Sequence, residues 1–167
     1  MFMSMTLPLG ISGFAIVLAA SSGACNSTAH GADADDGTYN CATETRADTF
    51  VVGLEKPGEA GKLDFKLLEA TPAPPARGDN TWKVQVNSMA AGVAGNPVGG
   101  ATMTVTPFMP DHAHGTPIQV IVTPMTTTGD YQLSPVNMWM PGLWETTMQV
   151  QAGGVSDTVV YRFCIPS

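Results

Sequence analysis

Two histidines and a methionine lie close together in the segment Met109 to Gly115. His112 and His114 are separated by one residue, so both imidazoles point to the same side if the segment is extended. Met109 is near enough in sequence to add a thioether. Imidazole is a good ligand for copper and zinc, and thioether favours Cu(I). The segment is therefore a candidate copper site.

A second segment, Asn137 to Gly142, carries two methionines on either side of Trp139. If the two segments meet at one end of the fold, they form a mixed imidazole and thioether site. Its candidate ligands are Met109, His112, His114, Met138 and Met140. The alternative is that the histidines bond to the backbone and the methionines pack at a sheet corner. Two histidines also fall short of a tetrahedral zinc site.

Features that would indicate an enzyme or a nucleic-acid-binding protein are missing from the sequence. It has no Cys-x-x-Cys, no glycine-rich phosphate loop and no nucleophile elbow. Asp111 adjoins His112 but has no evident nucleophile as partner. The net charge of −7 disfavours nucleic acid as a ligand. We expect a protein that is not an enzyme.

The N-terminus predicts export. Residues 1–24 read as a signal sequence, since Leu7 to Ala20 is apolar but short for a membrane span. Gly23-Ala24-Cys25 resembles the end of a bacterial lipobox. We expect lipidation at Cys25, a flexible tether over 25–38, and a place in the cell envelope, on the periplasmic side or outer surface. The alternative is ordinary signal-peptidase cleavage, which releases a soluble protein.

The three cysteines support this interpretation. In an oxidising compartment Cys41 is expected to pair with Cys164, near the two ends of the folded region. Cys25 is then left over for the lipid. In the chain-entropy model, closing so long a loop stabilises the fold by roughly 4 to 5 kcal/mol.

Residues 39–167 are expected to form one folded unit of short strands. Trp82, Val84 and Val86 alternate with polar residues, the period of a half-buried strand. Repeated strands and turns of this kind predict an all-β fold, an immunoglobulin-like antiparallel β-sandwich of seven to eight strands. The main sandwich is assigned to 79–167, and N-terminal strands with a proline-rich connection to 39–78.

Four local features are also predicted. Asp48–Leu54 and Ile118–Val122 are expected as strands, and Gly95–Pro97 as a turn. The proline-rich stretch Thr71–Gly78 is expected to cross between the two sheets.

Several motifs between Asn80 and Phe163 together resemble the YtkA-like (FixH-related) domain. They are the strand 82–86, Pro97-Val-Gly-Gly-Ala101, the Met109-to-Gly115 segment, Gly129-x-Tyr131 and Met140-Pro-Gly-x-Trp144. The resemblance implies a small immunoglobulin-like sandwich in an exported bacterial protein. It also implies a link to copper handling or cytochrome oxidase assembly, and it leaves 39–78 outside the domain.

The leading hypothesis is a lipid-anchored envelope protein whose YtkA-like domain binds copper. The competing hypothesis is a protein-interaction or structural module of the envelope without a metal, in which Trp139 and Met140 contact a partner.

Overall fold

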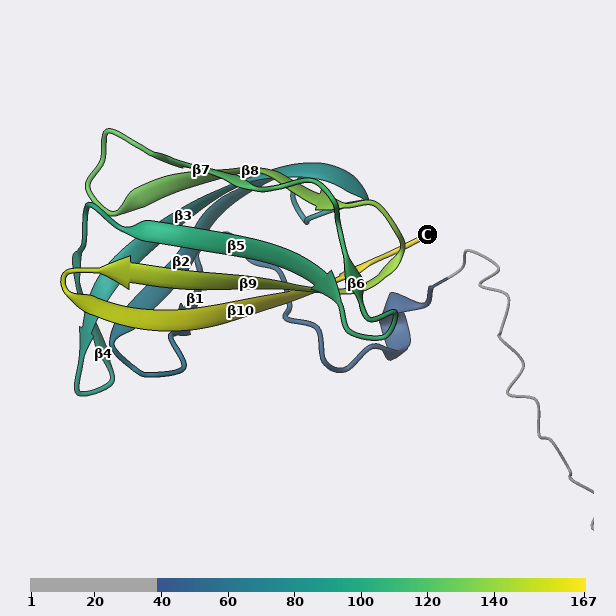
Figure 1. Cartoon of the computed structure of the whole chain (residues 1–167). Coiled ribbons are helices and arrows are strands. Elements are labelled where there is room, and N and C mark those ends of the chain that lie inside the picture. Colours follow the sequence, from purple (N-terminus) through teal and green to yellow (C-terminus); the bar gives the residue numbers. More distant parts are fainter. Residues whose placement is uncertain (1–38) are drawn as a thin grey trace, which may run out of the picture. The chain divides into compact units, whose positions relative to one another are not determined.

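The computed structural model describes residues 39–167 (Figure 1). The predicted signal sequence, the tether, Cys25 and His30 lie outside the described residues. In the part that is described, no helix is long and apolar enough to cross a membrane.

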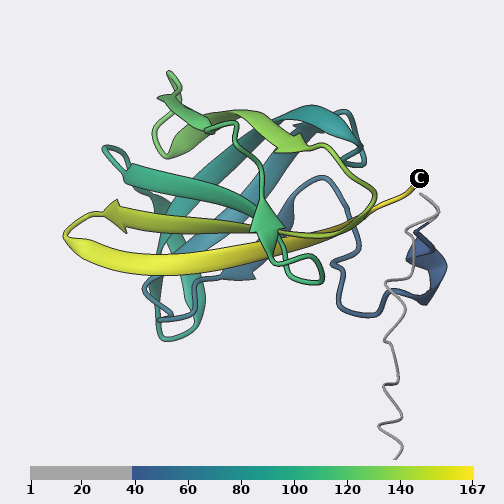
Figure 2. The ribbon, with the colours of Figure 1, turned by 45° about the vertical axis from the view of Figure 1, so that its right-hand side comes forward.

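Within residues 39–167, ten strands form two antiparallel sheets that face each other (Figures 1 and 2). The first sheet has the order β1-β2-β3-β8-β7, with β4 also paired to β3. Its strands are β1 (Leu54–Pro57), β2 (Leu63–Thr71), β3 (Gly78–Ala90), β4 (Val93–Pro97), β7 (Ile121–Pro124) and β8 (Asp130–Met138). The second has the order β10-β9-β5-β6, from β5 (Thr102–Met109), β6 (His114–Gly115), β9 (Gly142–Ala152) and β10 (Val155–Ile165). The predicted all-β antiparallel sandwich is confirmed, with ten strands in the described residues where seven to eight were expected.

The core lies between the sheets, as the alternating pattern predicts. Trp82, Val84 and Val86 on β3 are fully buried, while the residues between them are half-buried. The Trp82 ring meets the rings of Tyr161 and Phe163 edge-on, at centroid distances of 6.3 and 5.5 Å. These contacts join β3 of the first sheet to β10 of the second.

Several local predictions are wrong. Residues 48–53 contain no strand, since β1 begins only at Leu54, and β7 begins at Ile121 rather than Ile118. Gly95 to Pro97 belong to β4, whose residues are all exposed and therefore show no alternation. The connection 71–78 does not cross between sheets, because β2 and β3 are neighbours in one sheet.

The segment before β1 lies along β10. Asp48 donates its backbone N–H to the Arg162 carbonyl, and its carboxylate accepts from the Arg162 N–H and from Lys56 Nζ. Cys41 and Cys164 are joined as a disulfide, with Cα atoms 5.6 Å apart. The segment thereby covers backbone groups at the edge of β10, an edge that would otherwise be open to association with another strand.

Candidate functional site

The Met109-to-Gly115 segment is a tight hairpin and not an extended segment. β5 ends at Met109, which pairs with His114 of β6. The turn between them includes Ala113, whose φ of 53° is unusual for a residue with a side chain. A Cβ on Gly115 would lie 2.8 Å from the Pro107 carbonyl oxygen, so this close approach requires glycine. The hairpin still brings the two imidazoles together, with centroids 5.6 Å apart.

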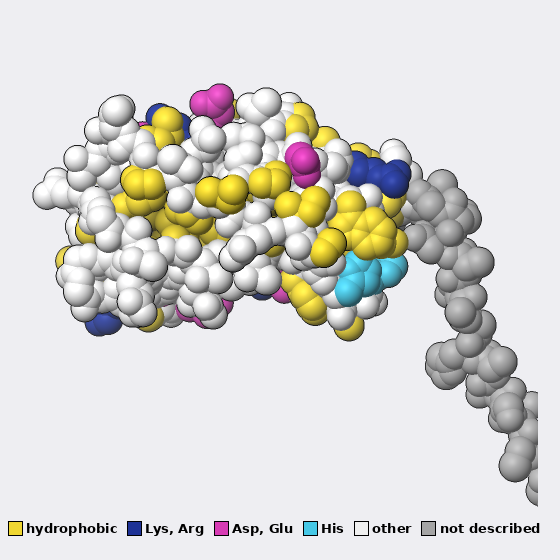
Figure 3. All heavy atoms as spheres, turned by 45° about the horizontal axis from the view of Figure 1, so that its top comes forward, with side chains coloured by type: hydrophobic (Ala, Val, Ile, Leu, Met, Phe, Trp, Pro, Cys, Tyr) yellow, Lys and Arg dark blue, Asp and Glu magenta, His cyan; other side chains and the backbone are white. Residues whose placement is uncertain are grey.

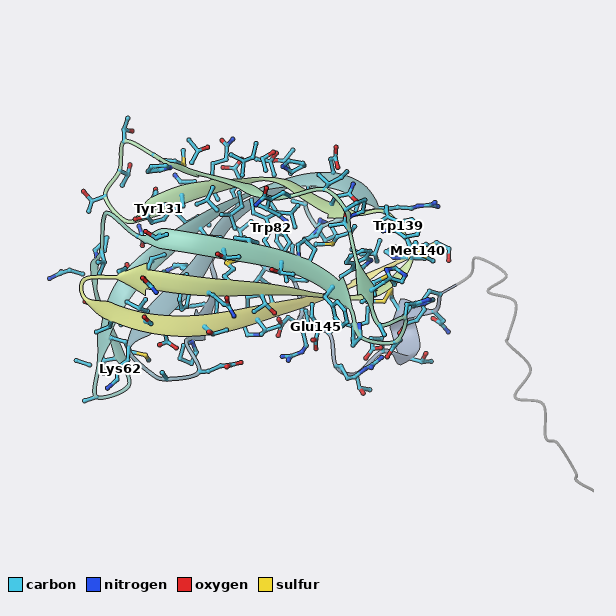
Figure 4. The ribbon with its side chains drawn as sticks, in the orientation of Figure 1. Lys62, Trp82, Tyr131, Trp139, Met140 and Glu145 are labelled. Carbon is cyan, nitrogen blue, oxygen red and sulfur yellow. A yellow bond between two sulfur atoms is a disulfide. The ribbon has the colours of Figure 1, made fainter. Side chains whose placement is uncertain are left out.

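The histidine hairpin meets the loop that follows β8. The His114 ring stacks on Trp139 at a centroid distance of 5.5 Å and an interplanar angle of 24°. In Figure 3 the histidine side chains form one patch beside hydrophobic side chains at one end of the molecule. Figure 4 shows Trp139 and Met140 at this same end. The two segments singled out in the sequence therefore lie side by side.

His114 has a preferred tautomer. Its Nδ1 lies 3.1 Å from the Gly115 carbonyl oxygen. Because a carbonyl oxygen can only accept a hydrogen bond, Nδ1 carries the hydrogen in this contact. In the neutral ring the lone pair is then on Nε2, which leaves that nitrogen able to ligate a metal.

The backbone of the Trp139–Gly142 loop is held at two points. Arg77 Nε donates to the Trp139 carbonyl at 2.8 Å, and Trp144 Nε1 donates to the Met140 carbonyl at 2.9 Å. Gly142 has a φ of 131°. A Cβ at that position would lie 2.6 Å from Met109 Cε, which places the Met109 side chain directly beneath the loop.

The three candidate methionines differ in burial. Met109 and Met138 end β5 and β8 and belong to the hydrophobic core, with 1% and 0% of their surface exposed. Met140 is half-buried in the loop and packs against that core. Within residues 39–167 no group of three or more His, Cys, Asp or Glu side chains is arranged to hold a metal ion.

Sequence reasoning missed an ion-pair cluster on the histidine hairpin. Arg46 donates from Nη1 and Nη2 to the two carboxylate oxygens of Asp111, each at 2.7 Å. Arg46 also bonds Glu44, which accepts from the Tyr39 hydroxyl at 2.8 Å. No sequence signal joins Arg46 to Asp111, because they are 65 residues apart.

This cluster stabilises the ionised forms of Asp111 and Glu44. The hydrogen bond from Arg46 holds the pKa of Asp111 below its usual range. Hydrogen bonds from Arg46, and then from Tyr39, lower the pKa of Glu44 to about 2. Burial, followed by the bond to Glu44, raises the pKa of Tyr39 to about 12.

Comparisons with solved structures give distant similarities. A copper-bound variant of FetP from uropathogenic Escherichia coli strain F11 is 11% identical, with 68% of this chain and 95% of that chain covered and a TM-score of 0.45. FetP from the same strain, as isolated, is 11% identical, with 68% of this chain and 98% of that chain covered and a TM-score of 0.43. A DUF4426 family protein from Pseudomonas aeruginosa PAO1 is 18% identical, with 64% of this chain and 94% of that chain covered and a TM-score of 0.42.

No curated protein matches the sequence. The family model described as YtkA-like matches residues 59–149. The match begins before Asn80 and stops within β9, so residues 59–78, expected outside the domain, lie inside it. Because the match covers more than half of the 167 residues, this chain belongs to the YtkA-like family.

Proposed function

We propose that this protein is an extracytoplasmic YtkA-like domain that binds a copper ion between the histidine hairpin and the Trp139–Gly142 loop. The observation that carries the proposal is the meeting of His112, His114 and Trp139 at one end of the sandwich. The hairpin supplies both imidazoles, and the adjacent loop, which is distant in sequence, carries Met140. Their side chains lie on strand ends and short turns of a rigid scaffold.

The donor set favours Cu(I) over zinc. Structural zinc sites use four ligands, and catalytic ones use three protein ligands, drawn from Cys, His, Asp and Glu. Imidazole together with neutral thioether suits the softer Cu(I) ion. His112 and His114 supply the imidazoles in this proposal, with the lone pair of His114 on Nε2.

The thioether comes from Met140 or Met109. Met140 is half-buried in the loop that carries Trp139, and Met109 Cε lies against Gly142 of the same loop. Met138 is fully buried in the core and is assigned to packing.

The proposed location is the cell envelope, with a lipid anchor at Cys25. This rests on the apolar N-terminus, the residues before Cys25, and the pairing of Cys41 with Cys164, which leaves Cys25 unpaired. Mass spectrometry of the protein purified from membranes tests it. A diacylglyceryl adduct on an N-terminal Cys25 is expected, and an unmodified N-terminus would overturn the anchor.

Titration with Cu(I) under ascorbate, against a chromophoric Cu(I) chelator, tests the metal site. We expect binding of one equivalent, abolished by His112→Ala with His114→Ala and unaffected by His30→Ala. The matched control is useful because His30 is the third histidine of the chain. Failure of the unaltered protein to compete for either Cu(I) or Cu(II) would exclude the proposal.

A second candidate function is a docking module without a metal. The observation in its favour is that Trp139, the first residue after β8, is 43% exposed. Aromatic side chains of this kind are enriched at interfaces. Photo-crosslinking from position 139 in intact envelopes distinguishes the two, since a discrete adduct that persists in the His112→Ala, His114→Ala variant would favour docking.

A further inference from the structure

The N-terminal segment Tyr39–Arg46 contacts both loops of the candidate site, although it lies outside the family match at 59–149. Its anchor is the bond between Cys41 and Cys164, which attaches the 3-10 helix η1 (Cys41–Thr43) to the end of β10. Tyr39 adds a hydrogen bond from its backbone N–H to Ser167 Oγ at 2.6 Å. The segment is therefore attached to the sandwich independently of the histidine hairpin.

Arg46 is the main contact to the histidine hairpin. Its guanidinium binds both oxygens of Asp111, the residue next to His112, and is oriented in turn by Glu44. The Glu44 side chain is only 5% exposed, although its partner Arg46 is 49% exposed. Paired bonds of this kind fix direction as well as distance.

Tyr39 contacts the other loop. Its ring carbons lie within 4 Å of the Cβ position of Gly142, the same position that Met109 Cε approaches from inside. The Tyr39 hydroxyl meanwhile donates to Glu44 and lies 3.4 Å from Asp111 Oδ2. One short segment thus connects the turn before His114 to the loop after Trp139.

We propose that Arg46 is a positioning residue for the metal site, holding His112 through Asp111 so that the two imidazoles are arranged before the ion arrives. This inference rests on the proposed function. His112 lies in an exposed turn, so without Arg46 its order must come from metal binding, at a cost in affinity. Outer partners of metal ligands typically contribute 10- to 100-fold in affinity. We expect Arg46→Gln to weaken Cu(I) binding roughly 10-fold, within the range for such partners.

The test introduces Arg46→Gln or Lys56→Gln into the full-length chain and compares the Cu(I) affinities of the two variants. Lys56 is the matched control because it pairs with Asp48 on the same N-terminal side and does not contact the hairpin. Arg46→Lys keeps the charge but loses the bidentate hydrogen bond to Asp111, so its Cu(I) affinity is expected to lie between those of Arg46→Gln and the unaltered protein. The Arg46–Asp111 pair is exposed and adds little to the free energy of unfolding, whereas removing the guanidinium from the nearly buried Glu44 should lower the melting temperature, and Arg46→Lys controls for that loss.

A second readout needs no metal. Amide hydrogen exchange of residues 111–115 in the metal-free protein should accelerate in Arg46→Gln and stay unchanged in Lys56→Gln. Unchanged affinity together with unchanged exchange in Arg46→Gln would overturn the positioning role. If the unaltered protein binds no copper but exchange responds as expected, the copper proposal fails and the contact between segment and hairpin stands.

Discussion

Two contacts fix the His114 ring. Its Nδ1 bonds the Gly115 carbonyl oxygen, and its face stacks on the Trp139 ring. Its stacking makes Trp139 an optical reporter of the site. The other two tryptophans, Trp82 and Trp144, are fully buried in the core.

Copper binding should therefore quench tryptophan fluorescence, and Trp139→Phe should remove most of this quenching. Because phenylalanine preserves an aromatic face for His114, the Cu(I) affinity is expected to change less than about threefold, well under 1 kcal/mol. Parallel fluorescence and chelator-competition titrations check both. Quenching that survives in Trp139→Phe would place the ion away from this loop.

Replacing each methionine by leucine identifies the thioether. Leucine conserves volume, so each change should cost under about 1.5 kcal/mol of folding stability. Met140→Leu or Met109→Leu is expected to weaken Cu(I) binding, while Met138→Leu should not. If all three variants bind Cu(I) as tightly as the unaltered protein does, no thioether binds the ion.

At the scale of elements, Gly142 joins the loop after Trp139 to β9. Gly142→Ala should destabilise the fold by roughly 2 to 4 kcal/mol, because it adds backbone strain and a collision with Met109 Cε. Gly154→Ala is the control, since Gly154 also has positive φ but no atom within 4 Å of its Cβ position, and should cost roughly 1 kcal/mol. Urea unfolding of both variants measures the difference. Equal losses of folding stability in Gly142→Ala and Gly154→Ala would mean that the contact with Met109 is not tight.

Asp157 fixes the connection between β1 and β2. It accepts backbone N–H bonds from Ala60, Lys62 and Leu63 and from its neighbour Thr158. Burial alone raises its pKa, but these four bonds outweigh burial and the pKa is lowered.

Asp157→Asn should cost roughly 2 to 3 kcal/mol of folding stability at pH 7, because one oxygen acceptor is replaced by a donor. A lowered pKa means that the carboxylate stabilises the fold above its ordinary pKa, and that this contribution disappears as pH falls through the folded value. The gap between the two proteins in urea unfolding should therefore narrow below about pH 4. A gap independent of pH would contradict a role for the charge.

The sequence predicts strands better than it predicts how they are connected. β3 alternates from Asn80 to Val86, and β5 alternates along its length, because one face is buried, and period two shows this directly. β4 has no buried face, and β6 consists of two residues paired only to the end of β5, so neither has a periodic signature. His112 and His114 were identifiable from spacing, whereas Arg46 acts across 65 residues that no local pattern connects.

For the whole molecule, the bond between Cys41 and Cys164 spans 123 residues. Cys41→Ser with Cys164→Ser should lower the free energy of unfolding by roughly 4 to 5 kcal/mol in the chain-entropy model. Chemical unfolding measures the loss, with Cys25→Ser as a control that should leave it unchanged. Native protein whose Cys41 and Cys164 react with a thiol reagent would contradict the pairing.

The hydrogen bond between Tyr39 and Ser167 brings both ends of the described chain to the end that carries the histidines (Figure 2). A polyhistidine tag added after Ser167 would place foreign imidazoles beside His112 and His114 and compete with them for copper. The β9–β10 turn at Gly153 and Gly154 lies at the opposite end (Figure 1). That turn is the better position for an affinity tag or a fluorophore when metal binding is to be measured.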